Sequence, residues 1–496
     1  MIEVRGSEVP AAERPNPGAL RSLLIGAGAA GRTMAQALRR VPDYGLIPIG
    51  FLDDDPVRRQ VAGLPVLGCI SDIAEVAAAN DADVALVTIP SLAPRRIAEI
   101  AALAHSAGLL VRFLPSFVAA LERDVRISDL RSIRVDRLLG REEVRVIRSS
   151  SRSVVEGKRV LVTGAGGSIG SELCRQIDRF SPACIYLLDH DESNLHRLQL
   201  QLRGHGLLDG DDLIIADIRD RDRVRQLFRE LRPEVVFHAA AHKHLPLLER
   251  YPCEGVKSNV AGTQHLVDAA VEFGVERFIL ISTDKAVDPS SVLGATKRLA
   301  EMIVRRNAGR GTRVASVRFG NVLGSRGSLL SVLQAQIERG EAVTITHPDV
   351  TRFFMTVEEA VGLVLEAAAM ADQGETFVLD MGKPVRIVDL VHNYASQLHM
   401  EDVEICFTGL RPGEKLDESL VASNEERELT AHPKIWNTRD RSHLPDDFEQ
   451  QLHALYALSG QNNAAEVRRH LSEIVAGYEP SEGQRTVDVA PYPDEW

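Results

Sequence analysis

The sequence lacks the features that would assign it to several other classes of protein. No window approaches ~18 uninterrupted apolar residues, so we predict no membrane-spanning helix. The N-terminal stretch MIEVRGSEVPAAERPNPG has no apolar core and does not predict a signal peptide. Basic residues are not in excess, because 58 Lys and Arg stand against 70 Asp and Glu, a net charge of −12. Nucleic acid is therefore not the expected partner, and we expect a cytoplasmic location.

Cysteine is also scarce and shows no metal-binding pattern. The five cysteines are odd in number and none forms a C-x-x-C pair. This usage predicts reduced core residues in a cytosolic protein, not disulfides or ligands, and we predict no metal site.

The chain is long enough for two or three domains, with 496 residues, of which 44% are hydrophobic and 26% charged. Apolar strands alternate with helical segments, which predicts an α/β protein with parallel sheets. We expect two Rossmann-like domains, the second with a smaller C-terminal substrate-binding part. The predicted boundaries are a disordered arm at 1–19, a Rossmann-like domain at 20–118, a connector at 119–156, a catalytic domain at 157–478 and a loose tail at 479–496.

The first domain opens with a glycine motif whose ligand the sequence leaves undecided. A strand at Ser22–Ile25 runs into Gly26–Gly31, a G-x-G-x-x-G, and a second strand ends near Asp53. This arrangement suits a phosphate at a helix N-terminus. A bound nucleotide or sugar nucleotide and an empty structural or regulatory domain are both compatible with the pattern.

A second glycine motif is stronger. The strand Arg159–Val162 leads into T-G-x-x-G-x-x-G, and Asp189 follows the last glycine by 189 − 170 = 19 residues. That spacing predicts a carboxylate on the adenosine ribose, which favours NAD because it repels the 2′-phosphate of NADP. Small residues after a later strand leave room for the nicotinamide. The predicted cofactor residues are Gly164, Gly167, Ser168, Ile169, Gly170, Asp189, Asp217, Ile218, Ala239 and Ala240.

The candidate chemistry lies after the strand Phe278–Ile281, which ends in Ser282, Thr283, Asp284 and Lys285. In open α/β sheets ligands collect at the carboxyl ends of strands. The next helix carries Lys297 inward.

Other polar groups flank this stretch. Lys243 and His244 are expected to face the substrate, although His242 and His244 are equally compatible with satisfied loop residues. Arg326, Arg352 and Arg411 follow strands, where each would either grip a diphosphate or form a surface salt bridge.

Together the motifs resemble the large bacterial nucleotide-sugar 4,6-dehydratases of polysaccharide biosynthesis, which are extended short-chain dehydrogenase/reductases acting on UDP-N-acetylglucosamine. The similarity spans about Leu23 to Tyr478. It rests on residues 163–170, HAAAHKHLP at 238–246, STDKAV at 282–287, GATKR at 294–298, VRFGNVLGSRGS at 317–328, THPDVTRFFMT at 346–356 and GLRPGEKLDE at 409–418.

The resemblance implies roles for these residues. Asp284 would be the acid at C6 of the sugar and Lys285 the base at C5, with burial lowering the pKa of the lysine. Thr283 would bond the C4 oxygen, and Lys297 would hold the nicotinamide ribose and supply positive charge near C4. The resemblance also adds Asn321 and Glu414 to the substrate-binding residues, and it implies NAD, a nucleotide-sugar substrate and a homo-oligomer.

Three departures from the family pattern stand out. The N-terminal membrane helices of large members are absent, His242 replaces an aromatic residue, and Leu293 stands where small members have Tyr and large members Met. Leu293 cannot accept a proton, so we hypothesise that Asp284 accepts the C4 proton, directly or through Thr283 or water. The alternatives are a nucleotide-sugar epimerase and a non-catalytic, NAD-gated sensor. Leu293 favours the sensor, whereas retention of Thr283, Asp284, Lys285 and Lys297 argues against it.

Overall fold

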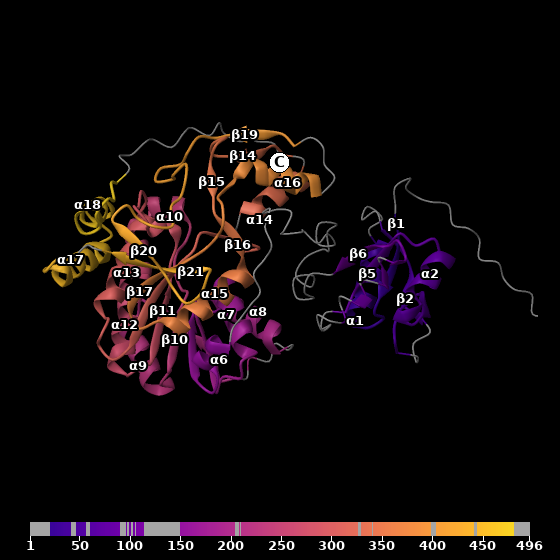
Figure 1. The fold of residues 1–496 in the computed structure, drawn as a ribbon, viewed down its shortest axis with the longest axis horizontal. Helices are drawn as coiled ribbons and strands as arrows, with labels where there is room; N and C mark the ends of the chain where they lie inside the picture. Colours follow the sequence, from indigo (N-terminus) through magenta and orange to yellow (C-terminus); the bar gives the residue numbers. More distant parts are fainter. Residues whose placement is uncertain are drawn as a thin grey trace, which may run out of the picture. The chain divides into compact units, whose positions relative to one another are not determined.

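The computed structural model describes residues 20–40, 46–55, 60–89, 96, 99–100, 103–104, 106–113, 149–203, 208, 210–325, 329–339, 341–397, 403–440 and 444–480. The chain divides into two compact units, Met1–Ile133 and Arg134–Trp496 (Figure 1). The predicted arm, most of the predicted connector and nearly all of the predicted tail lie outside the described residues.

The first unit contains a six-stranded sheet in the order β3-β4-β2-β1-β5-β6. Its central strands pair in parallel, and both faces of β1 are buried, as the continuous apolar run predicts. The elements are β1 (Leu20–Ile25), α1 (Ala29–Arg40), β2 (Leu46–Leu52), β3 (Gln60–Val61), β4 (Leu64–Gly68), η2 (Ile70–Asp72), α2 (Ile73–Ala79), β5 (Val84–Val87) and β6 (Leu110–Phe113).

The second unit is built on a nine-stranded sheet in the order β20-β21-β17-β12-β11-β10-β7-β8-β9. Strands β17 to β9 run parallel, and β20 and β21 add an antiparallel edge. The strands are β7 (Arg159–Thr163), β8 (Cys184–Asp189), β9 (Leu213–Ile215), β10 (Val235–His238), β11 (Arg277–Ile281), β12 (Arg313–Arg318), β17 (Gln373–Leu379), β20 (Glu425–Leu429) and β21 (Ile435–Asp440). Strand order reverses between β7 and β10, which is where such sheets bind ligands.

Helices cover both faces of this sheet (Figure 1). One face packs a core against α6 (Ser149–Val155), α7 (Ser168–Asp178), α8 (Glu192–Arg203) and α15 (Val357–Met370). The other packs against α9 (Arg221–Leu231), α12 (Gly262–Glu272) and α13 (Val292–Arg306). Helix α6 falls within the predicted connector, and its Val154 and Val155 are buried in the first of these cores.

Short segments complete the unit. Figure 1 shows α14, β14, β19 and α16 grouped at one end of it. They are α10 (Leu245–Arg250), α11 (Pro252–Gly255), η4 (Val256–Ala261), η5 (Asp284–Ala286), β13 (Asn321–Leu323), α14 (Leu329–Glu338), β14 (Val343–Ile345), β15 (Thr351–Arg352), β16 (Phe354–Thr356), β18 (Val385–Arg386), α16 (Ile387–Gln397), β19 (Ile405–Phe407), α17 (Phe448–Gly460) and α18 (Ala464–Ile474). Helices α17 and α18 cover α11 and α13 through a separate apolar core.

No helix in the described parts of the chain has the length and apolar character needed to cross a membrane.

Candidate active site

The glycine turn between β7 and α7 is packed too tightly for side chains. Gly164 has a positive φ of 66°, and a Cβ there would lie 2.7 Å from the Cα of Ala240. A Cβ at Gly170 would lie 2.1 Å from the carbonyl oxygen of Gly164. Glycine is therefore required at both positions. Gly167 caps α7, so bare backbone and the helix N-terminus face the neighbouring cavity.

Asp189 occupies the position expected for a ribose carboxylate. It ends β8, is 6% exposed, and accepts hydrogen bonds from the backbone N–H of Gly166 at 2.9 Å and of Asp191 at 3.1 Å. Its carboxylate is therefore fixed at the edge of a cavity of about 570 Å³. That cavity is also lined by predicted cofactor residues, namely Gly164, Gly167, Asp217, Ile218, Ala239 and Ala240.

A second cavity of about 750 Å³ adjoins the first, since residues such as Gly167 and Ala239 line both. It holds the remaining predicted cofactor residues, Ser168, Ile169, Gly170 and Lys297. The two cavities together form a continuous cradle from the Asp189 carboxylate to the end of β11. A cradle in which a Cβ would clash, with a buried carboxylate at its far end, fits NAD.

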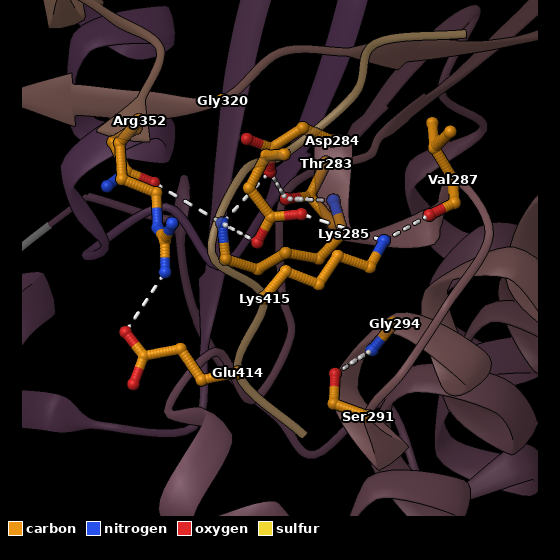
Figure 2. A network of polar contacts seen from close by, with 12 residues as sticks. Thr283, Asp284, Lys285, Val287, Ser291, Gly294, Gly320, Arg352, Glu414 and Lys415 are labelled. Atoms are coloured by element: carbon orange, nitrogen blue, oxygen red, sulfur yellow. Dashed lines mark hydrogen bonds and ion pairs between the residues drawn. The ribbon is translucent and has the colours of Figure 1, made fainter. Parts of the chain in front are cut away.

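The candidate reacting groups meet at the second cavity. Thr283 follows β11, and its Oγ1 donates a hydrogen bond of 2.9 Å to Oδ1 of Asp284, which is fully buried. The Lys285 Nζ donates to the same oxygen at 3.0 Å and to Oδ1 of Asn321 at 3.3 Å. Figure 2 shows Thr283, Asp284 and Lys285 pointing toward one another. The structure therefore couples one hydroxyl, one carboxylate and one ammonium through a single oxygen.

The second carboxylate oxygen of Asp284 is isolated. Oδ2 has no hydrogen-bond partner among the described residues. It lies against Gly320, where a Cβ would approach it to 2.8 Å. Asp284 has no exposed surface, whereas Thr283, which donates to it, lines the cavity.

The two lysines of the site have opposite pKa shifts. Burial alone would lower the pKa of Lys285, but the adjacent carboxylates of Asp284 and Glu418 outweigh burial and raise it. The expectation that burial would make Lys285 a ready base is therefore wrong for the resting site. Burial lowers the pKa of Lys297 to about 8, against a smaller opposing effect of Glu301. The Lys297 Nζ donates to the carbonyl oxygen of Ile281 at 2.6 Å.

Leu293 lies one helical turn before Lys297 on α13. It is 5% exposed and also lines the second cavity. An apolar side chain therefore faces the cavity at the position where the family resemblance leads one to expect a tyrosine or a methionine.

The turn after β10 is held by a side chain rather than by a ladder of backbone bonds. The Asn259 Oδ1 accepts from the backbone N–H of His242 at 2.8 Å, and its Nδ2 donates to the His242 carbonyl and to Thr296 Oγ1, both at 3.1 Å. Asn259 therefore supports the geometry of this turn. Lys243 and His244, predicted to face the substrate, line both cavities.

Of the predicted diphosphate arginines, the two that the structure describes, Arg352 and Arg411, do not line either cavity. Arg352 is 7% exposed and forms an ion pair of 3.0 Å with Glu414, which also accepts from Thr346 Oγ1 (Figure 2). Arg411 lies exposed on its loop, and Arg326 lies outside the described residues. Asn321, like Lys243 and His244, lines the second cavity.

A buried ion cluster supports the strand ends from beneath. Arg318 is fully buried and pairs with Glu301 at 2.7 Å and with Glu425 at 2.6 Å. Glu301 also accepts a hydrogen bond of 2.6 Å from Ser282 Oγ, next to Thr283. Local sequence spacing does not predict this cluster, because its members come from β12, α13 and β20.

Sequence reasoning also missed Glu418 and Lys415. Both belong to the segment 409–418, in which Glu414 was the residue predicted to bind substrate. Glu418 lies 3.6 Å from the Nζ of Lys285, and its side chain is 3% exposed.

The fold and the site together define a short-chain dehydrogenase/reductase of the extended, nucleotide-sugar dehydratase and epimerase type. The defining features are the parallel sheet, the glycine cradle with Asp189, and the set Thr283, Asp284, Lys285 and Lys297. Residues 160–440 match the family described as polysaccharide biosynthesis protein, and the chain belongs to this family. Residues 15–115 match a family described as a CoA-binding domain.

Relatives fall on both sides of the dehydratase and epimerase division. The chain is 43% identical to the probable polysaccharide biosynthesis protein EpsC of Bacillus subtilis, over 84% of this chain and 70% of that protein. It is 32% identical to a UDP-glucose 4-epimerase of Rickettsia rickettsii, over 62% of this chain and 89% of that protein. It is also 32% identical to a UDP-N-acetylglucosamine 4,6-dehydratase (inverting) of Campylobacter jejuni, over 61% of this chain and 83% of that protein.

Among solved structures, the chain resembles Pen from Bacillus thuringiensis. The TM-score is 0.53 and the identity 29%, and the match covers 61% of this chain and 98% of that one.

Proposed function

We propose that the protein is an NAD-dependent nucleotide-sugar 4,6-dehydratase acting on UDP-N-acetylglucosamine. The observation that carries the proposal is the bonded set Thr283, Asp284 and Lys285 beside the cradle that fits NAD. A dehydratase needs a proton acceptor at C4, an acid at C6 and a base at C5, and this set supplies an acid and a base next to each other.

When bound, NAD supplies a reversible hydride acceptor, which takes hydride from C4 and returns it at C6. The protein's own task is then to orient the sugar and to move protons. The overall reaction is redox-neutral, so it requires no further oxidant or reductant.

The proton from the C4 hydroxyl passes to Thr283, which gives its own proton to Asp284 Oδ1 along the existing 2.9 Å hydrogen bond. This relay replaces the missing tyrosine at Leu293. The 4-keto group makes the C5 proton acidic, and Lys285 removes it. Asp284 then returns its proton through Thr283 to the C6 hydroxyl, which leaves as water.

The remaining residues bind and orient. Lys297 holds the ribose next to the nicotinamide and supplies positive charge toward C4. Asn321, Lys243 and His244 contact the sugar nucleotide from the far side of the second cavity. Arg326, Arg352, Arg411 and Glu414 complete the diphosphate and nucleoside contacts, which for Arg352 requires its ion pair with Glu414 to open or to be shared.

An epimerase is the second candidate, supported by the identity to a UDP-glucose 4-epimerase. A 4-epimerase needs hydride transfer at C4 but no elimination, so a base for C5 would have no task in it. The position of Lys285, bonded to Asp284 and Asn321 at the cavity, favours the dehydratase.

Mass spectrometry of sugar nucleotides separates the two. The protein is expected to convert UDP-N-acetylglucosamine to a product lighter by one water, and to act much more slowly on UDP-glucose. A product of unchanged mass with inverted C4 would establish an epimerase and overturn the proposal. The matched control is the Asp284→Asn variant, which is expected to form no dehydrated product.

A further inference from the structure

Glu418 is a buried carboxylate beside Lys285 to which the proposed mechanism assigns no step. Its Oε1 lies 3.6 Å from the Nζ of Lys285, and its Oε2 lies 3.7 Å from the Nζ of Lys415. Oε2 has no hydrogen-bond partner among the described residues, although it is buried. A buried oxygen of this kind is costly unless it has a further role.

The surroundings of Lys285 create a specific problem for catalysis. Its Nζ contacts Asp284, Asn321 and Glu418, and all three present oxygen acceptors. The positive charge of Arg352 opposes the ammonium from one side, but the carboxylates prevail. Lys285 therefore rests as an ammonium group, and an ammonium group cannot remove a proton from C5.

Asp284 cannot relieve this problem, since in the proposed relay it already holds the C4 proton when C5 is deprotonated. That same protonation makes Lys285 a better donor, because it removes the carboxylate charge 3.0 Å from Nζ. Glu418 is then the one other carboxylate within 4 Å of the Lys285 Nζ among the described residues.

We propose that Glu418 stores the proton of Lys285 while the elimination takes place. The inference rests on the proposed function and adds one residue to it. The Lys285 ammonium gives a proton to Glu418 Oε1, which leaves a neutral amine and a neutral carboxylic acid. The amine takes the C5 proton and later returns it to C5. The acid then gives the stored proton back to the amine, so the enzyme ends in its starting state.

Lys415 and its neighbours fix the geometry of this exchange. The Lys415 Nζ donates to the Val287 carbonyl oxygen at 2.7 Å, just after η5 (Figure 2). The segment that carries Glu418 is thereby attached to the segment that carries Lys285. Glu418 acts through Lys285 and has no need to touch the sugar.

The test isolates the C5 step. A UDP-4-keto-6-deoxy-N-acetylhexosamine, the class of product proposed, is incubated with the NAD-containing enzyme in D₂O, and NMR follows exchange of its C5 proton. No hydride transfer is needed for this exchange. The enzymes compared all carry Asp284→Asn, because Asp284 would otherwise be free to take the Lys285 proton, 3.0 Å away; below, wild type refers to residue 418 alone. The wild type is expected to exchange at a rate independent of pH between about 6 and 7.5, because the proton moves within the Lys285 and Glu418 pair.

In Glu418→Gln the proton of Lys285 has to leave to solvent. Exchange at about pH 6 is expected to fall roughly 10- to 100-fold and to rise with pH by up to about tenfold per unit. Glu418→Asp keeps the carboxylate one methylene farther back and is expected to exchange slowly with a flat pH profile. Asp417→Asn is the matched control, since this exposed neighbour bonds Thr351 rather than Lys285, and it is expected to behave as wild type.

The outcomes are distinct. A glutamine variant that exchanges like the wild type overturns the inference, and so does one that is slow with a flat pH profile, which would indicate a purely structural role. If the glutamine variant fails to fold, a steep pH profile in Glu418→Asp overturns the inference by itself. Absence of C5 exchange in the wild type overturns the proposed function instead, and the inference with it.

Discussion

The Thr283 hydroxyl donates a 2.9 Å hydrogen bond to Asp284 Oδ1, and this bond joins a residue of the cavity to a carboxylate with no exposed surface. The arrangement explains how a site with Leu293 at the tyrosine position would still accept a proton from C4. In the proposed relay, the buried carboxylate supplies the basicity and the threonine supplies the contact with the sugar.

Asp284→Asn removes the proton acceptor and keeps the shape of the side chain. We expect C4 oxidation to slow by about 10²- to 10⁴-fold. Single-turnover absorbance of the reduced nicotinamide measures this step. Thr283→Ser, which keeps the hydroxyl, is expected to retain most of the rate. Oxidation at the normal rate in Asp284→Asn would show that the relay is wrong.

Lys297 gives the site a pH dependence. Its pKa is about 8, so the ammonium form dominates below that pH and the neutral amine above it. If the charge of Lys297 assists C4 oxidation, the single-turnover rate falls as pH rises through about 8. Lys297→Arg keeps its charge over this range, so any activity it retains is expected not to fall there. A wild-type rate that increases through the same pH would instead identify the neutral amine as the base.

Gly320 is predicted to tolerate no side chain. A Cβ there would lie 2.8 Å from Asp284 Oδ2, 3.0 Å from Phe353 Cβ and 3.1 Å from Met381 Sδ. We expect Gly320→Ala to displace Asp284, lower activity by at least about tenfold, and destabilise the fold by about 1–3 kcal/mol. Urea unfolding and product formation measure the two effects. Gly309→Ala serves as the control, since a Cβ at that exposed turn meets nothing within 4 Å. Its loss of stability is expected to come only from the strain of a positive φ. Wild-type activity in Gly320→Ala would contradict the prediction.

The sequence revealed those parts of the site that are local in the chain. The glycine turn, Asp189 and the run from Thr283 to Lys285 each follow a strand directly, and strand ends of a parallel sheet meet at one edge. Residue type and spacing were therefore enough to predict that the cofactor cradle and the reacting groups adjoin.

Properties that depend on contacts between distant segments were not predictable. Arg352 looked like a phosphate ligand, but Glu414, 62 residues away, pairs with it. Burial of Lys285 was expected to lower its pKa, but the carboxylates of Asp284, its neighbour in the chain, and of Glu418, which the fold brings beside it, raise it instead. Neither pairing with a distant residue leaves a signal in local spacing.

The buried cluster beneath the site yields a stability prediction. Arg318→Met would remove the guanidinium that joins Glu301 and Glu425 and leave Arg298 as their remaining cationic partner. We expect the free energy of unfolding to fall by about 3 kcal/mol. Despite burial, Arg318 lowers the pKa of Glu425 to about 2, below the ordinary value of 4.5. That stabilisation is present above about pH 4.5 and disappears as pH falls toward 2. The difference in the free energy of unfolding between wild type and variant should therefore become smaller in acid. Urea unfolding at neutral and acid pH measures this difference. A gap independent of pH would contradict this account.

Incubation with UDP-N-acetylglucosamine in D₂O, without added cofactor, tests the central claim most directly. NMR and mass spectrometry of the sugar are expected to reveal loss of water, a new C6 methyl group and deuterium at C5. That result would establish a 4,6-dehydratase that carries its own NAD and tolerates Leu293. Water retained in a sugar inverted at C4 or labelled at C5, or a sugar left unchanged by protein shown to contain NAD, would contradict it.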